Sequence, residues 1–258
     1  MLDLIIITGA GSGIGANVAV SSVSICKTMI IIGSSNTIHD TKNKILTKCN
    51  IIALQLDISD IDKVITSLEN EISKLGKISK IGIVLCAAQL GNYGGLFDSD
   101  LKEWNEIFRC NTLGNLSVVK ACYKSLKSGS SVRAVFFAGG GAAYGYQEFS
   151  GYSISKVAVV RAVENLGIEF KVKSFDASVI ALAPGAVSTK ILEKVIANGG
   201  MIKTRTDISE PTHFVQRFIT DNLNSHDLNG RFIHVRDEIE KINFQSENND
   251  LFKLRRVE

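Results

Sequence analysis

The sequence predicts an α/β fold, a doubly wound sheet of about seven parallel strands with helices on both faces. Short apolar runs alternate with segments of helical period along most of the 258 residues, and this alternation is typical of parallel strands joined by crossover helices. The first apolar run, Leu4–Thr8, leads into glycines at positions 9, 11, 13 and 15 and then into a helical pattern. In such a sheet, ligands bind beyond the carboxyl ends of the strands.

Seven strands are expected, at Leu4–Thr8, Met29–Ile32, Ile51–Leu56, Ile81–Cys86, Val132–Ala138, Ala177–Ala183 and Arg231–Val235. Helical patterns lie near residues 14–26, 39–48, 60–75, 99–127, 151–173, 189–197 and 209–223. Only two prolines occur, and no low-complexity linker or repeat divides the chain. We therefore expect a single domain over residues 1–238, with a lid at about 190–215, followed by a C-terminal tail over 239–258.

The composition excludes several classes of partner. The net charge is only +3, so no strong field for nucleic acid or anionic lipid is expected. The five cysteines include no Cys-x-x-Cys pair and the four histidines are scattered, so we expect reduced thiols and no metal site.

Strand-like sequence begins at residue 4 and no apolar run reaches roughly 18 residues. Neither a signal peptide nor a membrane span is expected, and the predicted location is the cytoplasm.

The stretch Leu4–Gly15 predicts a buried strand, a tight turn and a helix N-terminus. Glycine lets the backbone approach a phosphate without interference from a Cβ atom, and the helix dipole favours negative charge. A glycine-rich turn also ends strands for purely structural reasons, but its position between a strand and a helix favours nucleotide binding. The predicted contacts are Gly9, Gly11, Ser12, Gly13, Ile14 and Gly15.

The next two strand ends carry candidates for the adenosine half of a dinucleotide. After the second strand, no acidic residue is present to bind a ribose 2′-hydroxyl. Ser34, Ser35 and Asn36 can instead donate to a phosphate, although no arginine follows directly. NADP is therefore favoured over NAD, although a merely polar turn explains the same residues. After the third strand, Asp57 is suited to accept from the amine of an adenine, while Asp57 or Ser59 also suits the cap of the helix near Asp60.

Two helical segments carry candidate catalytic residues. Tyr152 and Lys156 are four residues apart and share a helix face. A nearby cation stabilises a phenolate, and lowering the tyrosine pKa to near neutrality requires about 4 kcal/mol from Lys156 and a cationic cofactor ring. Asn111 stands inside the pattern 99–127, where an asparagine either faces solvent or binds a specific group. The turn Pro184–Thr189 ends a strand, and Thr189 is positioned to cap the following helix.

Together these motifs resemble the short-chain dehydrogenase/reductase family over about residues 2–236. The resemblance implies a Rossmann domain that binds NAD(P) and transfers hydride between the cofactor and a carbonyl or alcohol carbon. Tyr152 would be the acid or base, Lys156 would bind the nicotinamide ribose, and Asn111 would link the lysine to solvent. The further cofactor contacts that it implies are Ser34, Asp57, Ile58, Ala87, Pro184, Gly185, Val187 and Thr189.

The sequence departs from the family at two places. Cys86–Gln89 replaces the usual Asn-Asn-Ala-Gly, which removes amides that tie the central strands together. Gly139 stands about 13 residues before Tyr152, where the family has the serine that polarises the substrate oxygen. Loss of such a donor costs about 3–4 kcal/mol in the barrier. Ser150, Ser153, Tyr144 or a substrate hydroxyl are the candidates to replace it.

The resulting prediction is an NAD(P)-dependent oxidoreductase that interconverts a carbonyl and a secondary alcohol on a small molecule, with a sugar or nucleotide-sugar as one candidate. The alternative is a dinucleotide-binding protein that has lost catalysis and acts as a sensor or subunit. A homodimer or homotetramer is expected through the helix of Tyr152 and Lys156. Four basic residues of the lid either meet an anionic substrate or are solvated: Lys190, Lys194, Lys203 and Arg205.

Overall fold

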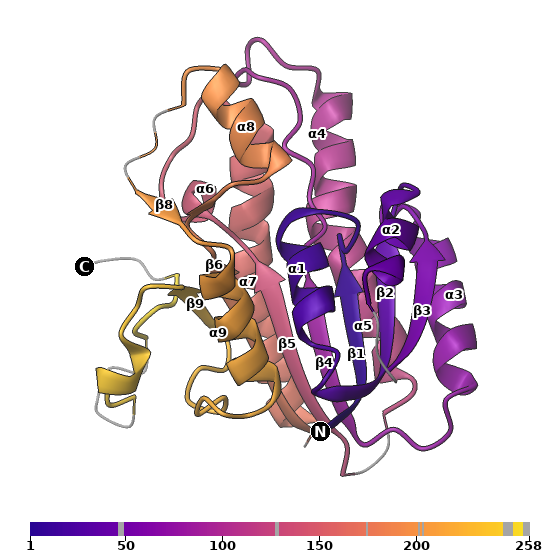
Figure 1. Ribbon diagram of the computed structural model, residues 1–258. Helices are drawn as coiled ribbons and strands as arrows, with labels where there is room; N and C mark the ends of the chain where they lie inside the picture. The colour runs from indigo at the N-terminus through magenta and orange to yellow at the C-terminus, as the bar shows by residue number, and fades with distance from the viewer. Residues whose placement is uncertain are drawn as a thin grey trace.

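A computed structural model describes residues 1–45, 49–126, 129–173, 175–200, 202, 204–244 and 250–254. Its main sheet has seven strands in the order β3-β2-β1-β4-β5-β6-β9, and all neighbours are parallel (Figure 1). The strands are β1 (Leu2–Thr8), β2 (Cys26–Gly33), β3 (Asn50–Gln55), β4 (Lys80–Leu85), β5 (Ser131–Phe137), β6 (Asp176–Ala183) and β9 (Arg231–His234). The direction of winding reverses between β1 and β4, so the predicted doubly wound sheet is confirmed.

Helices cover both faces of this sheet. One face carries α3 (Ile61–Ser73), α5 (Asn115–Tyr123) and α7 (Ser150–Val172). The other carries α1 (Gly13–Ser21), α2 (Thr37–Asn43) and α9 (Ser209–Ile219). None of the helices in the described ranges is long and apolar enough to span a membrane.

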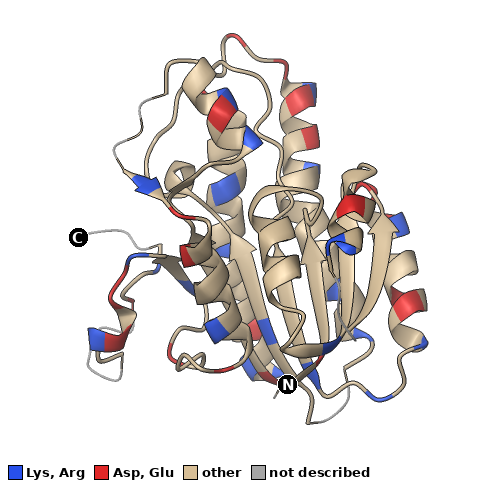
Figure 2. Cartoon of the chain, in the orientation of Figure 1, with Lys and Arg blue, Asp and Glu red and all other residues tan. Residues whose placement is uncertain are grey.

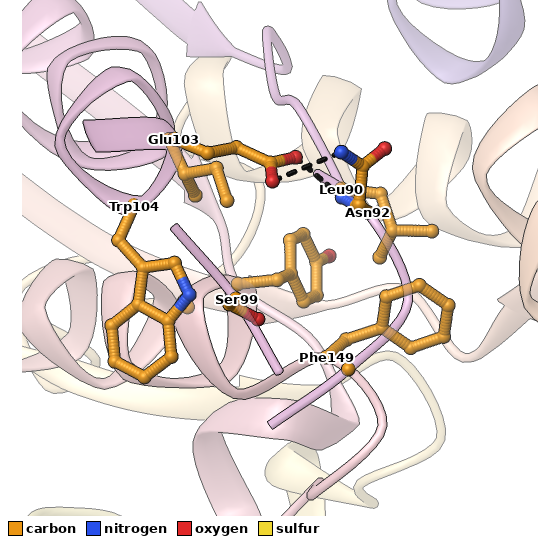
Figure 3. Close-up of a pocket in the computed structure, with 10 residues that line it drawn as sticks. Leu90, Asn92, Ser99, Glu103, Trp104 and Phe149 are labelled. Atoms are coloured by element: carbon orange, nitrogen blue, oxygen red, sulfur yellow. Dashed lines mark hydrogen bonds between the residues drawn. The ribbon is translucent and has the colours of Figure 1, made fainter. Parts of the chain in front are cut away.

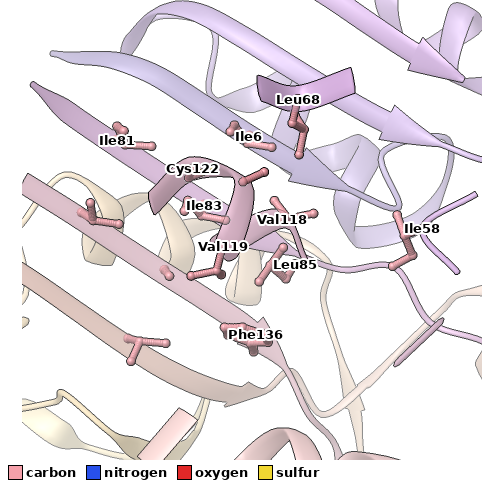
Figure 4. Packing of buried hydrophobic residues seen from close by; sticks show 14 of the residues in the cluster. Ile6, Ile58, Leu68, Ile81, Ile83, Leu85, Val118, Val119, Cys122 and Phe136 are labelled. Carbon is pink, nitrogen blue, oxygen red and sulfur yellow. The ribbon is translucent and has the colours of Figure 1, made fainter. Parts of the chain in front are cut away.

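The two faces are packed from alternate residues of each strand. In β1, Leu4 and Ile6 belong to the cluster under α3 and α5, whereas Ile5 and Ile7 belong to the cluster under α1 and α9. Figure 4 shows the first cluster, in which Leu68 of α3 and side chains of α5 cover β1 and β4. All four β1 side chains are fully buried. Each contributes about 1.5–3 kcal/mol of hydrophobic stabilisation.

Several helix boundaries differ from the prediction. The helix expected over 14–26 ends at Ser21, because β2 begins at Cys26. The helix expected over 99–127 is three segments: α4 (Leu101–Phe108), a π-helical turn (Arg109–Gly114) and α5. Residues 46–48 and 127, at the ends of two expected helices, lie outside the described part. The sequence pattern did not predict four short elements: α6 (Gly140–Ala143), β7 (Ala186–Val187), β8 (Arg205–Thr206) and the 3₁₀ turn Ile239–Lys241.

The segment expected as a lid, residues 190–215, has two different environments. Its first part is α8 (Lys190–Ala197), which has no buried residue and lies beyond the carboxyl ends of the strands (Figure 1). Thr189 caps α8 as predicted, its hydroxyl accepting from the backbone N–H of Leu192 at 3.3 Å. The last part belongs to α9, whose Phe214 and Val215 are in the core. Residues 209–215 therefore form part of the layer that covers the sheet.

The described part of the expected tail packs back on its own chain. The backbone N–H of Phe232 in β9 donates to the carbonyl of Phe252 at 2.8 Å. The N–H of Leu254 donates to the carboxylate of Glu164 on α7 at 2.6 Å, and Arg161 donates to the Leu254 carbonyl. Residues 250–254 thus lie along the outer side of β9. Residues 245–249 and 255–258 of the tail lie outside the described part.

A buried amide joins the central strands where the sheet reverses direction. The Oδ1 of Asn115 accepts from the Thr8 hydroxyl at the end of β1, at 3.0 Å, and its Nδ2 donates to the carbonyl of Ala87 beyond β4. The N–H of Ala87 in turn donates to the Thr8 hydroxyl at 3.1 Å. Asn115 therefore provides a tie of the kind that the Cys86–Gln89 sequence is expected to lack.

Replacing Asn115 with alanine is expected to lower the free energy of unfolding by about 2 kcal/mol, because buried partners at Thr8 and Ala87 lose their hydrogen bonds. Urea denaturation measures this loss. Asn105→Ala, on the exposed side of α4, is the matched control and should change stability by less than about 0.5 kcal/mol. Equal effects of the two substitutions would contradict the role assigned to Asn115.

Candidate active site

The glycine-rich turn after β1 is set by close backbone contacts. Gly9 has φ +64°, and a Cβ atom at this position would lie 2.8 Å from the backbone nitrogen of Ala87. A Cβ atom on Gly15 would lie 2.5 Å from the Gly9 carbonyl oxygen. Only glycine permits these approaches, so the first turn of α1 lies directly against the end of β1.

The N-terminus of α1 is a suitable site for an anion. Ser12 is at the N-cap position, but its side chain makes no capping hydrogen bond. The first amides of α1 are therefore not satisfied by a side-chain cap, and the helix dipole adds positive potential there. The predicted residues Gly13, Ile14 and Gly15 form this first turn. Their arrangement fits the pyrophosphate of a dinucleotide.

The turn after β6 meets the glycine-rich turn. A Cβ atom on Gly13 would lie 3.2 Å from Cγ2 of Thr189. The predicted contacts Pro184, Gly185, Val187 and Thr189 are thus held on the same side of the sheet as the turn after β1. Val187 is buried, whereas Gly185 is exposed.

The predicted adenosine contacts lie at the ends of β2 and β3. Ser34 is exposed directly after β2. Asp57 is also exposed, and its carboxylate accepts from the N–H of Ser59 at 2.9 Å; Ile58 beside it is buried. The interpretation that Asp57 or Ser59 caps α3 is wrong, since the cap is Asp60, which accepts from Lys63 N–H at 3.3 Å.

Asn111 lies in the π-helical turn between α4 and α5 and is fully buried. Its Oδ1 accepts from the N–H of Gln89 at 2.7 Å, and its Nδ2 donates to the Gln89 carbonyl and to the Ser155 hydroxyl, both at 2.9 Å. The interpretation that Asn111 faces solvent is therefore wrong. A π-helical turn is frequent at functional sites because it redirects side chains that a regular helix would place elsewhere.

Lys156 and Tyr152 lie on one face of α7, as predicted. Lys156 is only 2% exposed, and its Nζ donates to the Phe137 carbonyl at the end of β5, at 2.8 Å. The same Nζ is 5.5 Å from the centroid of the Tyr152 ring. The Ser155 hydroxyl donates to the Tyr152 carbonyl and accepts from Asn111. The three predicted catalytic residues are thus connected through the first turns of α7.

Burial dominates the protonation of this pair. It raises the pKa of Tyr152 to about 12, to which Tyr146 also contributes, and lowers the pKa of Lys156 to about 8. The expected lowering of the tyrosine pKa is therefore not produced by the protein groups in this arrangement. At neutral pH the phenol is protonated and the lysine carries its charge.

Gly139 faces the phenol of Tyr152. A Cβ atom at this position would lie 3.7 Å from the Tyr152 hydroxyl oxygen, with no other contact within 4 Å. Its φ of +153° is in the range that favours glycine. Gly139 thus lies beside the Tyr152 hydroxyl but provides no side-chain donor.

A small pocket beside Tyr152 is lined by residues that the sequence analysis did not single out (Figure 3). Trp104 of α4 covers Gly151, where a Cβ atom would lie 2.9 Å from the indole ring. Phe149 is buried and contacts Tyr93 edge to face, with ring centroids 5.8 Å apart. These rings come from segments far apart in the chain, and no spacing motif predicts their meeting.

The carboxylate of this pocket and two basic residues of the lid are hydrogen-bonded within the protein. The Glu103 carboxylate accepts from the backbone N–H of Asn92 at 2.6 Å and from its Nδ2 at 3.0 Å (Figure 3). In the lid, Lys194 donates to the Gly91 carbonyl and Arg205 donates to the Ser188 hydroxyl.

Around the site, acidic and basic residues are interspersed on α4 and α8 (Figure 2). Of the basic lid residues, Lys190 is exposed and Lys203 lies outside the described part. Within the described ranges, no cluster of three or more His, Cys, Asp or Glu is arranged to hold a metal ion.

Comparison with known proteins identifies related sequences. Residues 3–200 match the profile of the family described as short chain dehydrogenase. A probable tetrahydroxynaphthalene reductase of Zymoseptoria tritici is 26% identical over 195 residues, 74% of this chain and 70% of that protein. Versicolorin reductase 1 of Dothistroma septosporum is 28% identical over 196 residues, 74% of this chain and 71% of that protein.

Solved structures share the fold at lower identity. Levodione reductase superposes with a TM-score of 0.76 at 20% identity, covering 90% of this chain and 95% of that one. NAD⁺-bound xylitol dehydrogenase has a TM-score of 0.76 at 16% identity, covering 90% of this chain and 96% of that one. These likenesses establish the arrangement of strands and helices.

The buried charge of Lys156 predicts a pH-dependent stability difference. Below pH 8 the folded protein bears the full cost of burying the ammonium, on the order of 3 kcal/mol. As the pH rises from about 8 toward the unfolded value of 10.5, the folded lysine loses its proton first and the cost disappears. The stability of the wild type should therefore rise relative to Lys156→Met over this range.

Urea denaturation of both proteins between about pH 7 and pH 10 measures this difference. The hydrogen bond to Phe137 that the substitution removes adds a constant offset and does not affect the trend. Lys171→Met, at an exposed position of α7, is the control and should show no pH-dependent difference. A constant gap between wild type and Lys156→Met would contradict the burial of a charged lysine.

Proposed function

The chain belongs to the short-chain dehydrogenase family, and on that premise we propose that it is an NAD(P)-dependent oxidoreductase that interconverts a carbonyl and a secondary alcohol. The observation that carries the proposal is the buried Lys156, which donates to the Phe137 carbonyl and lies beside the ring of Tyr152. A catalytic pair at the carboxyl ends of the strands, beside a glycine-rich turn, is where a dinucleotide would present its reactive ring.

The residues of the site fit such a cofactor. The amides of Gly13, Ile14 and Gly15 would hold the pyrophosphate, and Ser34 would lie near the adenosine ribose. Asp57, Ile58 and Ala87 would surround the adenine and its ribose. Lys156 would bind the nicotinamide ribose, with the Pro184–Thr189 turn beside the nicotinamide. When bound, the nicotinamide would supply or accept the hydride.

The protonated phenol of Tyr152 is suited to act as the acid that reduction of a carbonyl requires. A phenol whose pKa is raised to about 12 keeps its proton at neutral pH and can give it to a carbonyl oxygen that becomes an alcohol. Lys156 keeps a positive charge beside the phenol and stabilises the phenolate left behind. Asn111 holds the backbone of Gln89 and the hydroxyl of Ser155, which fixes the start of α7.

We favour an aromatic or polycyclic carbonyl compound as substrate. The pocket beside Tyr152 is lined by Trp104 and Phe149, and its carboxylate, Glu103, is bonded to Asn92. The indole of Trp104, which is partly exposed, can stack on a flat apolar ligand. The related reductases are named for tetrahydroxynaphthalene and versicolorin. Neither observation supports the sugar or nucleotide-sugar that the sequence suggests.

A second candidate function is that of a dinucleotide-binding sensor or subunit without catalysis. Gly139 favours it, because this position offers no hydroxyl to the substrate oxygen. Such a protein would bind NADH or NADPH and show no turnover with any carbonyl compound. The catalytic proposal requires turnover that depends on Tyr152.

We also propose that the protein forms a homodimer or homotetramer through α7 in the cytoplasm. Ile154, Val157, Ile168 and Val172 leave one side of α7 apolar and exposed, from 37% for Val157 to 79% for Val172. An exposed apolar helix face of this kind is typical of a subunit interface. None of the five cysteines forms a disulfide, as expected in a reducing compartment.

Tyr152→Phe is expected to lower kcat for reduction of an aromatic ketone by about a thousandfold, because the proton donor is lost. Oxidation of NADPH or NADH with phenanthrenequinone and β-tetralone measures turnover, and NADPH fluorescence measures cofactor binding. Binding should change little. Tyr123→Phe, on α5, is the control. Undiminished turnover of Tyr152→Phe would rule out the proposed role.

Ser34→Asp is expected to shift cofactor preference from NADP toward NAD by at least about tenfold, because a carboxylate repels a 2′-phosphate and binds a 2′-hydroxyl. The ratio of the dissociation constants of NADPH and NADH measures it. Ser24→Asp adds the same charge before β2, at the opposite end of this strand. It should leave the ratio unchanged. A ratio unaffected by Ser34→Asp would place the ribose elsewhere.

A further inference from the structure

A carbonyl that is being reduced gains negative charge on its oxygen, and a second hydrogen-bond donor besides the acid stabilises it. Gly139 provides none. We propose that Tyr146 supplies this second donor, so that two phenols, those of Tyr146 and Tyr152, bind the substrate oxygen. This inference rests on the proposed oxidoreductase function and adds a residue that contacts the substrate.

Tyr146 is located beside the pocket of Tyr152. It lies in the segment between α6 and α7, and its carbonyl accepts from the N–H of Phe149 at 3.1 Å. The rings of Tyr146 and Phe149 are 5.5 Å apart at an interplanar angle of 57°. Since Phe149 lines the same pocket as Tyr152, this contact places the Tyr146 ring next to that pocket.

The hydroxyl of Tyr146 extends toward the lid. A Cβ atom on Gly200, just after α8, would lie 3.3 Å from this hydroxyl oxygen. No hydrogen bond joins the hydroxyl to any residue of the described part, so its proton is available to a ligand there. Beside burial, the charge of a phenolate at Tyr146 would raise the pKa of Tyr152.

The other candidate hydroxyls are already hydrogen-bonded within the protein or are exposed to solvent. Ser153 is buried and donates to the Gly141 carbonyl at 2.8 Å, and Ser150 donates to the Gln147 carbonyl at 3.1 Å. Tyr144 is 80% exposed. Of the two tyrosines in the segment between α6 and α7, only Tyr146 is partly buried, and its ring lies against Phe149 of the pocket.

The two phenols have different tasks. Tyr152 gives its proton to the substrate oxygen, and Lys156 stabilises the phenolate that remains. Tyr146 keeps its proton and donates a hydrogen bond to the same oxygen, so no charge moves to it. Burial and the neighbouring Glu148 raise the pKa of Tyr146, which keeps this hydroxyl a donor at neutral pH.

Tyr146→Phe removes the hydroxyl and keeps the ring. With phenanthrenequinone or β-tetralone as substrate, kcat should fall by about a hundredfold, the typical effect of losing one such donor. NADPH binding should be unchanged. Tyr144→Phe, two residues earlier, is the matched control and should keep wild-type kcat. A wild type that is active and a Tyr146→Phe variant as active as Tyr144→Phe would overturn the inference while leaving the proposed function intact.

Binding provides a readout that does not depend on turnover. β-Naphthol, an aromatic alcohol, should quench protein fluorescence when it binds the NADP complex of the wild type, and Tyr146→Phe should weaken this binding by about tenfold. Equal affinities, or no binding to the wild type, would overturn the inference. Without wild-type turnover of any ketone, the proposed function fails, and naphthol binding still decides whether Tyr146 contacts an oxygen.

A rescue variant separates the hydroxyl from the shape of the loop. In Gly139→Ser/Tyr146→Phe, the serine would face the Tyr152 hydroxyl from a Cβ position 3.7 Å away. Its kcat should be at least about tenfold higher than that of Tyr146→Phe, because the donor is replaced. A double variant that melts like the wild type but regains no activity would contradict the role of Tyr146 as a donor. If the φ at Gly139 prevents folding, the comparison of Tyr146→Phe with Tyr144→Phe decides.

Discussion

The backbone contact among Gly9, Gly15 and Ala87 is the constraint on which the site depends. It lets the end of β1, the start of α1 and the chain leaving β4 approach more closely than side chains would permit. Thr8 and Asn115 fix the same junction with hydrogen bonds. Because the sheet reverses direction there, the opening above it is available to a ligand. The arrangement of β1, α1 and β4 and the proposed cofactor site therefore depend on one junction.

Burial, more than neighbouring charges, determines the pKa values of Tyr152 and Lys156. Lys156 stays close to the Phe137 carbonyl and the Tyr152 ring, and its surroundings oppose its charge. Asn111 is withdrawn from solvent by a π-helical turn and used to hold the start of α7. The phenol of Tyr152 consequently keeps its proton at neutral pH.

The strands, the parallel sheet and the Tyr152–Lys156 face were predictable, because apolar periodicity and an i,i+4 spacing are local properties of the chain. The burial of Asn111 was not, because it depends on a π-helical turn that tertiary packing imposes. Asn115, four residues later, offered a local signal: the two amides share a helix face. Trp104 and Phe149 line one pocket although they are far apart in the chain, so no spacing identifies them. The spacing to Tyr152 identified Gly139, but the effect of this glycine on the site depends on the residues around it.

The C-terminal segment has a consequence for solubility. A strand at the edge of a sheet presents unpaired backbone groups to which another chain can add. On β9, the N–H of Phe232 is already bonded to Phe252, and residues 250–254 lie between the strand and solvent. Intermolecular strand pairing is thereby hindered on this side of the sheet. Residues 250–254 thus cover a strand edge at which another chain could otherwise add.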